Sequence, residues 1–112
     1  MSSPDPGRPL ADAAPVFAAL GDATRLDLVS RLNDGQARSI AQLTDGTGLT
    51  RQGVTKHLRV LERAGIVSSS NVGRESQFTY VPEPIKQVQS YLDTVSVQWD
   101  DALSRLKASV ES

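Results

Sequence analysis

The chain has 112 residues, a formal net charge of −1 and no cysteine. This length fits one domain with a modest core, which an oligomeric interface would help to stabilise. A net charge near zero excludes a protein that coats polyanions through overall basicity, so any nucleic-acid site has to be local. Without cysteine, disulfides and thiolate metal sites are excluded, and the single histidine cannot build a multi-histidine site.

The sequence gives no sign of a targeting or membrane-spanning segment. Residues 1–9 are polar and carry three prolines, which predicts a flexible tail rather than a signal peptide. No apolar run approaches the roughly 20 residues that span a bilayer. The expectation is a soluble cytoplasmic protein without membrane partners.

The first two helices are predicted from capping residues and apolar spacing. Residues 10–20 are alanine-rich, with Asp12 as the predicted cap and Pro15 in the first turn. Asp22 suits the cap of a second helix over residues 23–32. The apolar side chains of this second helix are expected to point inward: Leu28, Val29 and Leu32, with Leu26 beside them.

A short third helix and a tight turn precede the most informative segment of the chain. Ser39 suits a helix cap, and the Asp-Gly-Thr-Gly run at residues 45–48 predicts a sharp turn. Thr50 suits the cap of the next helix, which is predicted over residues 51–64. Its inward-facing side chains recur at helical spacing: Val54, Leu58 and Leu61. Short helix, turn and amphipathic helix in succession predict a helix-turn-helix.

The outer face of the helix at residues 51–64 is polar and cationic. Residues 48–74 hold five cations and one carboxylate, Glu62, so phosphate attraction is concentrated there. In a helix-turn-helix the N-terminus of this helix meets base edges, where arginine pairs with guanine and glutamine with adenine. Arg51 and Gln52 are therefore predicted to read bases. The other predicted DNA contacts are Thr50, Thr55, Lys56, His57, Arg59 and Arg74.

Several of these residues have a second interpretation that the sequence leaves open. The cations Lys56, Arg59 and Arg63 alone would also fit the solvated face of a surface helix. His57 lies at the edge of the apolar stripe, where it either packs or caps, or else binds a phosphate. Gly53 costs about 1 kcal/mol relative to alanine in a helix. It either lets the backbone approach the duplex closely or is simply tolerated near the helix start.

After Gly65 the pattern changes from helical to extended. Strands over residues 66–71 and 77–81, joined by a turn at residues 71–75, predict a hairpin, or wing. The Pro-Glu-Pro run at residues 82–84 blocks further strand pairing.

A long last helix is predicted from residue 85 to residue 106. Its apolar residues alternate three and four apart for about three heptads. A stripe this long cannot be covered fully by a small domain, which favours self-association over packing within a monomer. An aromatic residue at this spacing belongs to the apolar seam more often than to a ligand site. The predicted dimer interface consists of Val16, Phe17, Leu20, Ile85, Val88, Leu92, Val95, Trp99 and Leu106.

These elements predict a mainly α fold with a small β-hairpin: a winged helix-turn-helix of five helices and a two-stranded wing. The expected organisation is a disordered tail at residues 1–9, a DNA-binding domain at residues 10–81 and a dimerisation helix at residues 82–112. The expected partners are double-stranded DNA and a second copy of the chain.

Three segments resemble the ArsR/SmtB-type winged helix-turn-helix repressors. ALGDATRL at residues 19–26 resembles their N-terminal signature. VTKHLRVL at residues 54–61, with AGIV at residues 64–67, resembles their reading helix and its exit. GR at residues 73–74 matches the wing tip, where the resemblance implies a cation that reaches the DNA backbone or minor groove. The resemblance covers residues 16–81 and implies a DNA-binding transcriptional regulator, a repressor by analogy.

The chain departs from the metal-sensing members of that family. Many relatives carry a cysteine-valine-cysteine box in the third helix, whereas this chain has Ser-Ile-Ala at residues 39–41. Asp93 in the last helix has no histidine partners for the alternative interhelical site. No metal or other cofactor is therefore expected. A metal-independent branch of the family is also suggested by resemblances at Arg51, Gln52, Trp99, Leu103 and Leu106.

Two other function classes remain open at this stage. A winged helix that serves only as a protein-interaction module would lack salt-dependent affinity for duplex DNA. A small-molecule sensor with a pocket at the dimer interface would bind DNA with an affinity that an unknown effector changes. An enzyme is not expected, because Val54 stands where a phosphate-binding loop needs lysine. The single histidine, His57, also leaves no assembly of nucleophile, base and orienting acid.

Overall fold

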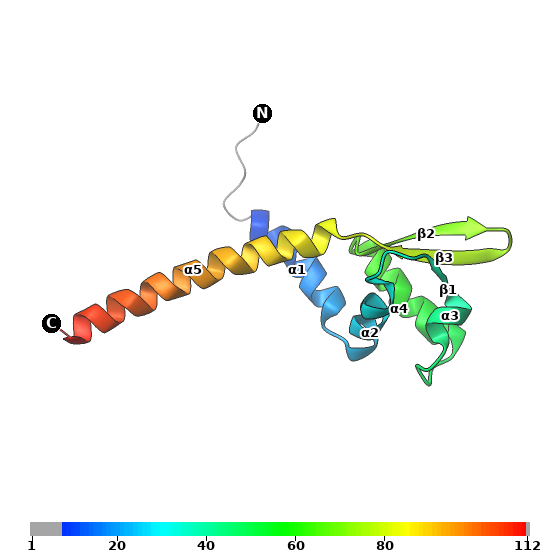
Figure 1. The fold of residues 1–112 in the computed structure, drawn as a ribbon, viewed down its shortest axis with the longest axis horizontal. Helices are drawn as coiled ribbons and strands as arrows, with labels where there is room; N and C mark the ends of the chain where they lie inside the picture. The colour runs from blue at the N-terminus through cyan, green and yellow to red at the C-terminus, as the bar shows by residue number, and fades with distance from the viewer. Residues whose placement is uncertain (1–7, 112) are drawn as a thin grey trace, which may run out of the picture.

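The computed structural model describes residues 8–111. Its elements are α1 (Arg8–Leu20), α2 (Ala23–Leu32), β1 (Arg38–Ser39), α3 (Ile40–Thr44), α4 (Arg51–Arg63), β2 (Val67–Val72), β3 (Glu75–Tyr80) and α5 (Glu83–Glu111). Figure 1 shows a body of helices α1 to α4, a hairpin of β2 and β3, and the long helix α5. The predicted winged helix-turn-helix with five helices is confirmed.

Side-chain caps fix the starts of α2, α3 and α4 at the predicted residues. In each case the side-chain oxygen accepts a hydrogen bond from the amide three residues later, at 3.0 Å for Asp22, 3.2 Å for Ser39 and 3.0 Å for Thr50. Gln42 completes a capping box at α3, because its side chain accepts from the amide of Ser39 at 2.9 Å. These bonds satisfy amides that have no partner within their own helix.

The core lies where α1, α2, α3 and α4 meet the sheet and the first turns of α5. Its apolar side chains with no exposed surface are Leu28, Leu32, Leu43, Val54, Leu58, Leu61, Ile66 and Phe78. The predicted inward face of α4 is therefore confirmed. In α2 the expectation for Leu26 is wrong, because its side chain is 51% exposed. Leu26 and Leu28 lie about 200° apart around the helix, so they cannot share its buried face.

The sheet contains one strand more than the predicted wing. β2 and β3 pair antiparallel from Val67 opposite Tyr80 to Val72 opposite Glu75, within two residues of the predicted strands. The two-residue strand β1 joins the other edge of β3, which gives the strand order β1-β3-β2. A strand of two residues carries no periodic signal, so only the tertiary pairing identifies it.

Helix α1 begins at Arg8, so residues 8 and 9 are helical rather than part of the predicted tail. The rest of that predicted tail, residues 1–7, lies outside the described residues. Asp12 is consequently inside the helix and is not its cap, and Pro15 is internal rather than in the first turn. Proline removes one intrahelical hydrogen bond. The burial of neighbouring residues such as Val16 in the core outweighs that loss.

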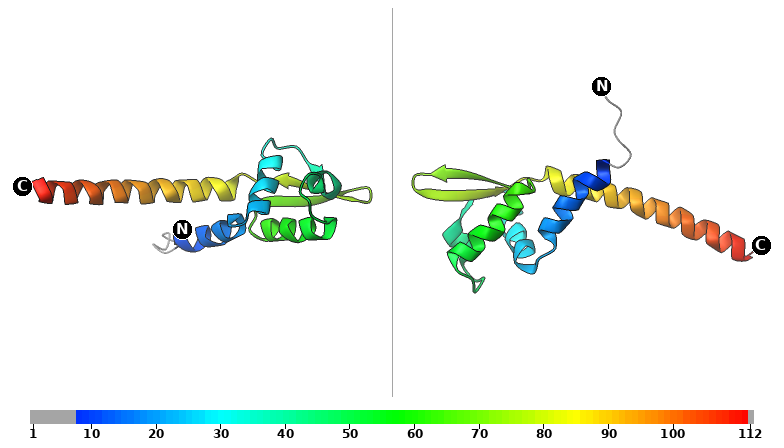
Figure 2. Two further views of the ribbon diagram at one scale, coloured as in Figure 1. Left: turned by 90° about the horizontal axis from the view of Figure 1, so that it is seen from below. Right: turned by 180° about the vertical axis from the view of Figure 1, so that it is seen from behind.

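Helix α5 has 29 residues and begins at Glu83, two residues before its predicted start. Pro84 is tolerated in the first turn, where amides lack intrahelical partners in any case. The start of α5 packs on α1, and its later turns leave the body on the side opposite the wing, as both views in Figure 2 show. The described chain is therefore elongated, with extents of 68 × 39 × 21 Å.

Candidate nucleic-acid interface

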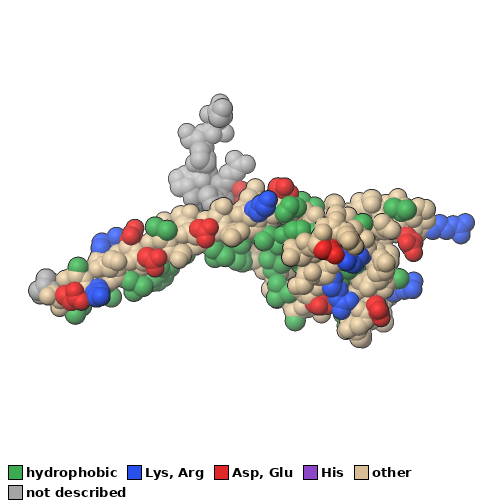
Figure 3. Space-filling model, viewed as in Figure 1, with side chains coloured by type: hydrophobic (Ala, Val, Ile, Leu, Met, Phe, Trp, Pro, Cys, Tyr) green, Lys and Arg blue, Asp and Glu red, His purple; other side chains and the backbone are tan. Residues whose placement is uncertain are grey.

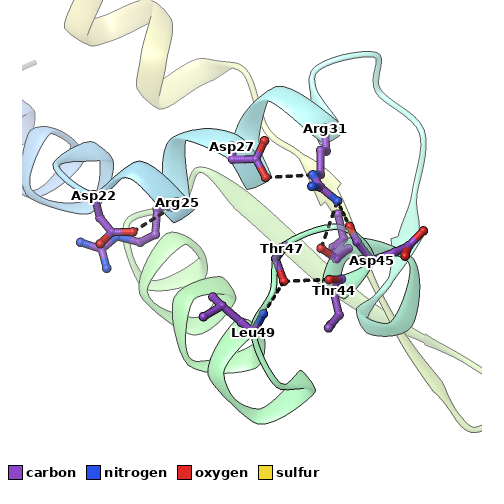
Figure 4. A network of polar contacts seen from close by, with 9 residues as sticks. Asp22, Arg25, Asp27, Arg31, Thr44, Asp45, Thr47 and Leu49 are labelled. Carbon is purple, nitrogen blue, oxygen red and sulfur yellow. Dashed lines mark hydrogen bonds and ion pairs between the residues drawn. The ribbon is translucent and has the colours of Figure 1, made fainter.

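The turn between α3 and α4 is held by side chains, which fixes where α4 begins. Thr47 Oγ1 donates to the carbonyl of Thr44 at 2.7 Å and accepts from the amide of Leu49 at 3.1 Å (Figure 4). Arg31 of α2 forms an ion pair with Asp27 at 2.9 Å and donates to the carbonyl of Asp45. Helix α4 therefore starts from a turn that is fixed to the body.

The predicted base-reading residues lie in the first turn of α4 and are exposed. Arg51 and Gln52 line a hollow of about 300 Å³ together with Thr55 and the wing residue Arg74. Residues from β1, α3 and β3 complete its wall. The fold thus brings together predicted DNA contacts that lie more than 20 positions apart in the sequence.

The outer face of α4 presents cations without partners in the protein. Across residues 8–111, the side chains of Arg51, Lys56, Arg63 and Arg74 make no hydrogen bond or ion pair. A second hollow of about 490 Å³ runs along this face and is lined by residues from Gln52 to Arg63. Figure 3 shows a Lys or Arg side chain, in blue, at the outer end of the wing. These free cations are available to an anionic partner.

Thr50 and Gly53 together form the cap of α4. The Gly53 amide donates a hydrogen bond to the Thr50 hydroxyl. The side chain of Thr50, a predicted DNA contact, is therefore engaged within the protein. A Cβ at Gly53 would lie 3.3 Å from that hydroxyl oxygen, which is closer than most such contacts. Glycine at position 53 leaves room for the capping hydroxyl of Thr50, and this local packing explains why a glycine fits here. The predicted contact Thr55 likewise donates its hydroxyl to the carbonyl of Arg51 at 2.7 Å.

His57 faces the junction of α1 and α2, which fits the packing alternative. Its Nδ1 lies 3.2 Å from Arg25 Nη1 and 3.7 Å from an oxygen of Asp22. Arg25 also donates through Nε to the carbonyl of Ala19 at the end of α1, at 2.5 Å. Its backbone hydrogen bond to Asp22, helped by the nearby His57, lowers the pKa of that carboxyl. The sequence did not indicate this role for Arg25, although the residue lies in the segment that resembles the family signature.

Arg59 is a predicted DNA contact on α4 whose charge is paired within the protein. It donates to Glu62 at 2.8 Å, and its guanidinium carbon lies 5.5 Å from the centre of the Phe78 ring. Glu62 also accepts a hydrogen bond from the hydroxyl of Ser69 on β2. The Ser69 hydroxyl and Arg59 both lower the pKa of Glu62. Sequence reasoning missed Ser69, but the i,i+3 spacing of Arg59 and Glu62 was a signal for their pairing.

The predicted dimer residues fall into three groups by exposure. Val16 and Val88 are each 5% exposed and pack inside the chain's own core. Leu20, Ile85 and Val95 are half-buried. The remaining four are exposed by 40% to 65%: Phe17, Leu92, Trp99 and Leu106. Figure 3 shows apolar side chains along the underside of α5 and onto the adjoining body.

No metal site is recognisable in the part of the chain that the structure describes. Within residues 8–111, no three His, Asp or Glu side chains lie close enough to share an ion. Across the same residues, no helix combines the length and apolar character of a membrane span.

A short helix, a fixed turn, an exposed helix N-terminus and a wing on the same side define a winged helix-turn-helix. A family model described as a helix-turn-helix domain matches residues 20–69. The chain is 34% identical to YuzN, an uncharacterized HTH-type transcriptional regulator of Bacillus subtilis, over 65% of this chain and 86% of that protein. It is 29% identical to the HTH-type transcriptional repressor SmtB of Mycobacterium tuberculosis, over 88% and 71% of the respective chains.

A solved structure has a fold similar to that of this chain, at a sequence identity comparable to that of YuzN. An ArsR-like transcriptional regulator from Rhodococcus sp. RHA1 aligns with a TM-score of 0.75 and 32% identity, covering 88% of this chain and 92% of that one. The chain therefore belongs to the ArsR/SmtB-type helix-turn-helix transcriptional regulators. The resemblance inferred from the sequence is confirmed, and members of this family are regulators rather than enzymes.

Proposed function

We propose that the protein is a dimeric repressor that reads an operator with the N-terminus of α4 and holds the duplex with its wing. The observation that carries this proposal is the common hollow lined by Arg51, Gln52 and Arg74. A chain with a net charge of −1 has little general attraction for DNA, so unpaired cations on one face matter more. A regulator of transcription has to reach the chromosome, so we propose the cytoplasm as its compartment.

The residues at the two ends of this surface have different proposed roles. Arg51 and Gln52 contact base edges in the major groove, where their side chains match guanine and adenine. Lys56 contacts phosphates from the next turn of α4, and Arg74 contacts the backbone or the minor groove from the wing. His57 faces α2, and this position supports packing rather than a phosphate contact.

The exposed stripe on α5 supports a dimer. The two-fold symmetry of that dimer would place two copies of α4 about one duplex turn apart, roughly 34 Å, in successive major grooves. The operator is then an inverted repeat whose half-site centres lie about ten base pairs apart.

Alanine substitutions test the two roles of the proposed DNA contacts. Arg51→Ala or Gln52→Ala should cost about 1–3 kcal/mol on the preferred operator and relax the preference at one position of each half-site. Affinity for random duplex should fall much less. Arg74→Ala should weaken specific and random duplexes by similar factors. It should also lower the salt-dependence slope by about one unit for each phosphate that a chain no longer neutralises. Selection from a random duplex pool, followed by salt titrations, measures both effects.

Arg105 provides a matched control for these arginine substitutions, because it is exposed on α5 and far from the wing. Arg105→Ala should leave the affinity and the salt slope unchanged. If the substitutions at Arg51, Gln52 and Arg74 also leave them unchanged, the helix-turn-helix does not bind DNA. The fold would then serve as a protein-interaction module.

We also propose that this regulator belongs to a metal-independent branch of its family. The chain offers no thiolate and one imidazole, whereas zinc, cadmium and nickel sites use several such ligands at fixed spacing. Zinc, cadmium, nickel or arsenite in modest excess should leave operator affinity unchanged in a fluorescence titration. Stoichiometric metal binding that releases the operator would reveal a carboxylate site instead.

A further inference from the structure

We infer that Arg59, Glu62 and Ser69 form a clamp that sets the position of the wing relative to α4. Arg59 is then a positioning residue rather than the DNA contact that its place on a basic helix predicts. This inference rests on the proposed function, since it explains how Arg74 at the wing tip is held where it meets the duplex.

The clamp uses both oxygens of one carboxylate. Glu62 Oε1 accepts from Arg59 on its own helix at 2.8 Å, and Glu62 Oε2 accepts from the Ser69 hydroxyl on β2. The guanidinium of Arg59 also lies over the ring of Phe78 on β3, with its central carbon 5.5 Å from the ring centre. One side-chain cluster on α4 thus contacts both strands of the wing.

The register of the hairpin explains why these contacts converge. Ser69 and Phe78 are directly opposite each other in the antiparallel pair, so their side chains share the face of the sheet that meets α4. Ser68, the neighbour of Ser69, points to the other face because successive strand residues alternate. Ser68 has the same chemistry on the same strand and makes no hydrogen bond to Glu62, so it is a natural control.

Because the wing projects beyond Ser69, a small change in direction at Ser69 moves the wing tip by a larger distance. Residues 68–75 are exposed, so the outer part of the hairpin has little apolar packing to hold its direction. β2 runs on from Ser69 to its end at Val72, a span of roughly 10 Å in an extended strand, and Arg74 lies in the turn beyond it. A rotation of about 10° at Ser69 would move the tip by roughly 2 Å, which is enough to break a hydrogen bond to a phosphate.

The charges also argue against a direct phosphate contact from Arg59. Its charge is already neutralised by Glu62, the single carboxylate between residues 48 and 74. If Arg59 turned to a phosphate, the Glu62 carboxylate would be left without its cation close to the polyanion. Arg59 therefore contributes more to DNA binding by staying on Glu62 than by leaving it.

Amide hydrogen exchange in the DNA-free protein tests whether the clamp holds the wing. Ser69→Ala should speed exchange of the wing amides by roughly five-fold, the factor that corresponds to a typical net hydrogen-bond contribution. Ser68→Ala should leave exchange unchanged, and Ser69→Thr, which keeps the hydroxyl, should behave like the wild type. If Ser69→Ala and Ser68→Ala give the same wing exchange, the clamp does not exist.

Binding to a duplex of random sequence tests the consequence for DNA. Ser69→Ala should weaken binding by no more than Arg74→Ala does, and so should Arg59→Ala combined with Glu62→Gln, which leaves no unpaired carboxylate beside the duplex. Neither change should add to the effect of Arg74→Ala, because both act through the same wing contact. If Arg59 instead binds a phosphate itself, Arg59→Ala with Glu62→Gln will lower the salt slope of the Arg74→Ala protein by about one further unit per chain. That additive result would overturn the inference.

The two measurements separate failure of this inference from failure of the proposed function. A wild-type protein without salt-dependent duplex affinity would refute the proposed function and, with it, the positioning role of Arg59. The exchange measurement would then still decide whether the wing is clamped. Normal duplex binding with no difference between the Ser69 and Ser68 variants would refute the clamp alone.

Discussion

Replacing Leu92 and Val95 together with glutamate should convert the proposed dimer into a monomer. Two added charges per chain would meet their symmetry-related copies in a closed interface, where burying unpaired charge costs several kcal/mol. Sedimentation velocity measures the change in mass directly. Operator affinity should fall by a factor on the order of 10² or more, because two linked half-site contacts become independent.

The opposite face of α5 supplies a control with the same number of added charges. Ser90 and Val97 lie about 140–160° from Leu92 around the helix, and both are exposed. Ser90→Glu combined with Val97→Glu should leave the dimer intact. The single tryptophan gives a second measurement, since Trp99 is 65% exposed in one chain. Its emission should shift to the red as dilution separates the subunits, and a Leu92/Val95 double variant that still sediments as a dimer would contradict the predicted interface.

Leu28→Ala should lower the free energy of unfolding by about 2–5 kcal/mol. The Leu28 side chain has no exposed surface and packs in the core beside α4, so its truncation leaves a cavity. Such a loss is a large fraction of the stability of a small domain. Denaturant unfolding at a fixed protein concentration measures it, because dimer dissociation contributes to the apparent stability.

Leu26 is the matched control in the same helix. Its side chain is 51% exposed, so Leu26→Ala should change the free energy of unfolding by about 0.5 kcal/mol or less. Equal losses for the two variants would mean that Leu26 is covered in the assembled protein. The surface between subunits would then extend onto α2.

The elements that could be predicted from the sequence are those specified by local chemistry. Asp22, Ser39 and Thr50 each cap the helix that follows, because a cap needs only a side-chain oxygen close to amides three residues on. The buried stripe of α4 follows from helical spacing alone. The predicted start of α1 was wrong because it relied on local signals alone. Asp12 and Pro15 suggest a later start, but packing against the core extends the helix to Arg8.

The contacts that could not be predicted join residues that are distant along the chain. Arg25 meets His57 across 32 positions, and neither residue's neighbours specify the other. Ser69 contacts Glu62 only because a particular strand register turns it toward α4. The proposed site was predictable where it depends on helix position, as for Arg51 and Gln52. The i,i+3 spacing signalled the pair of Arg59 and Glu62, but the sequence did not show that this pair also contacts the wing.

The position of Arg25 makes the orientation of α4 depend on α1. One guanidinium donates to carbonyls at the end of α1 and reaches the His57 ring on α4. A rotation of α1 must therefore stretch these bonds or turn α4 with it. Because α1 packs on α5, a change in how the subunits of the proposed dimer meet would also turn α4. The spacing and tilt of the two α4 helices on the proposed operator would then depend on the subunit contact as well as on the DNA-binding surface.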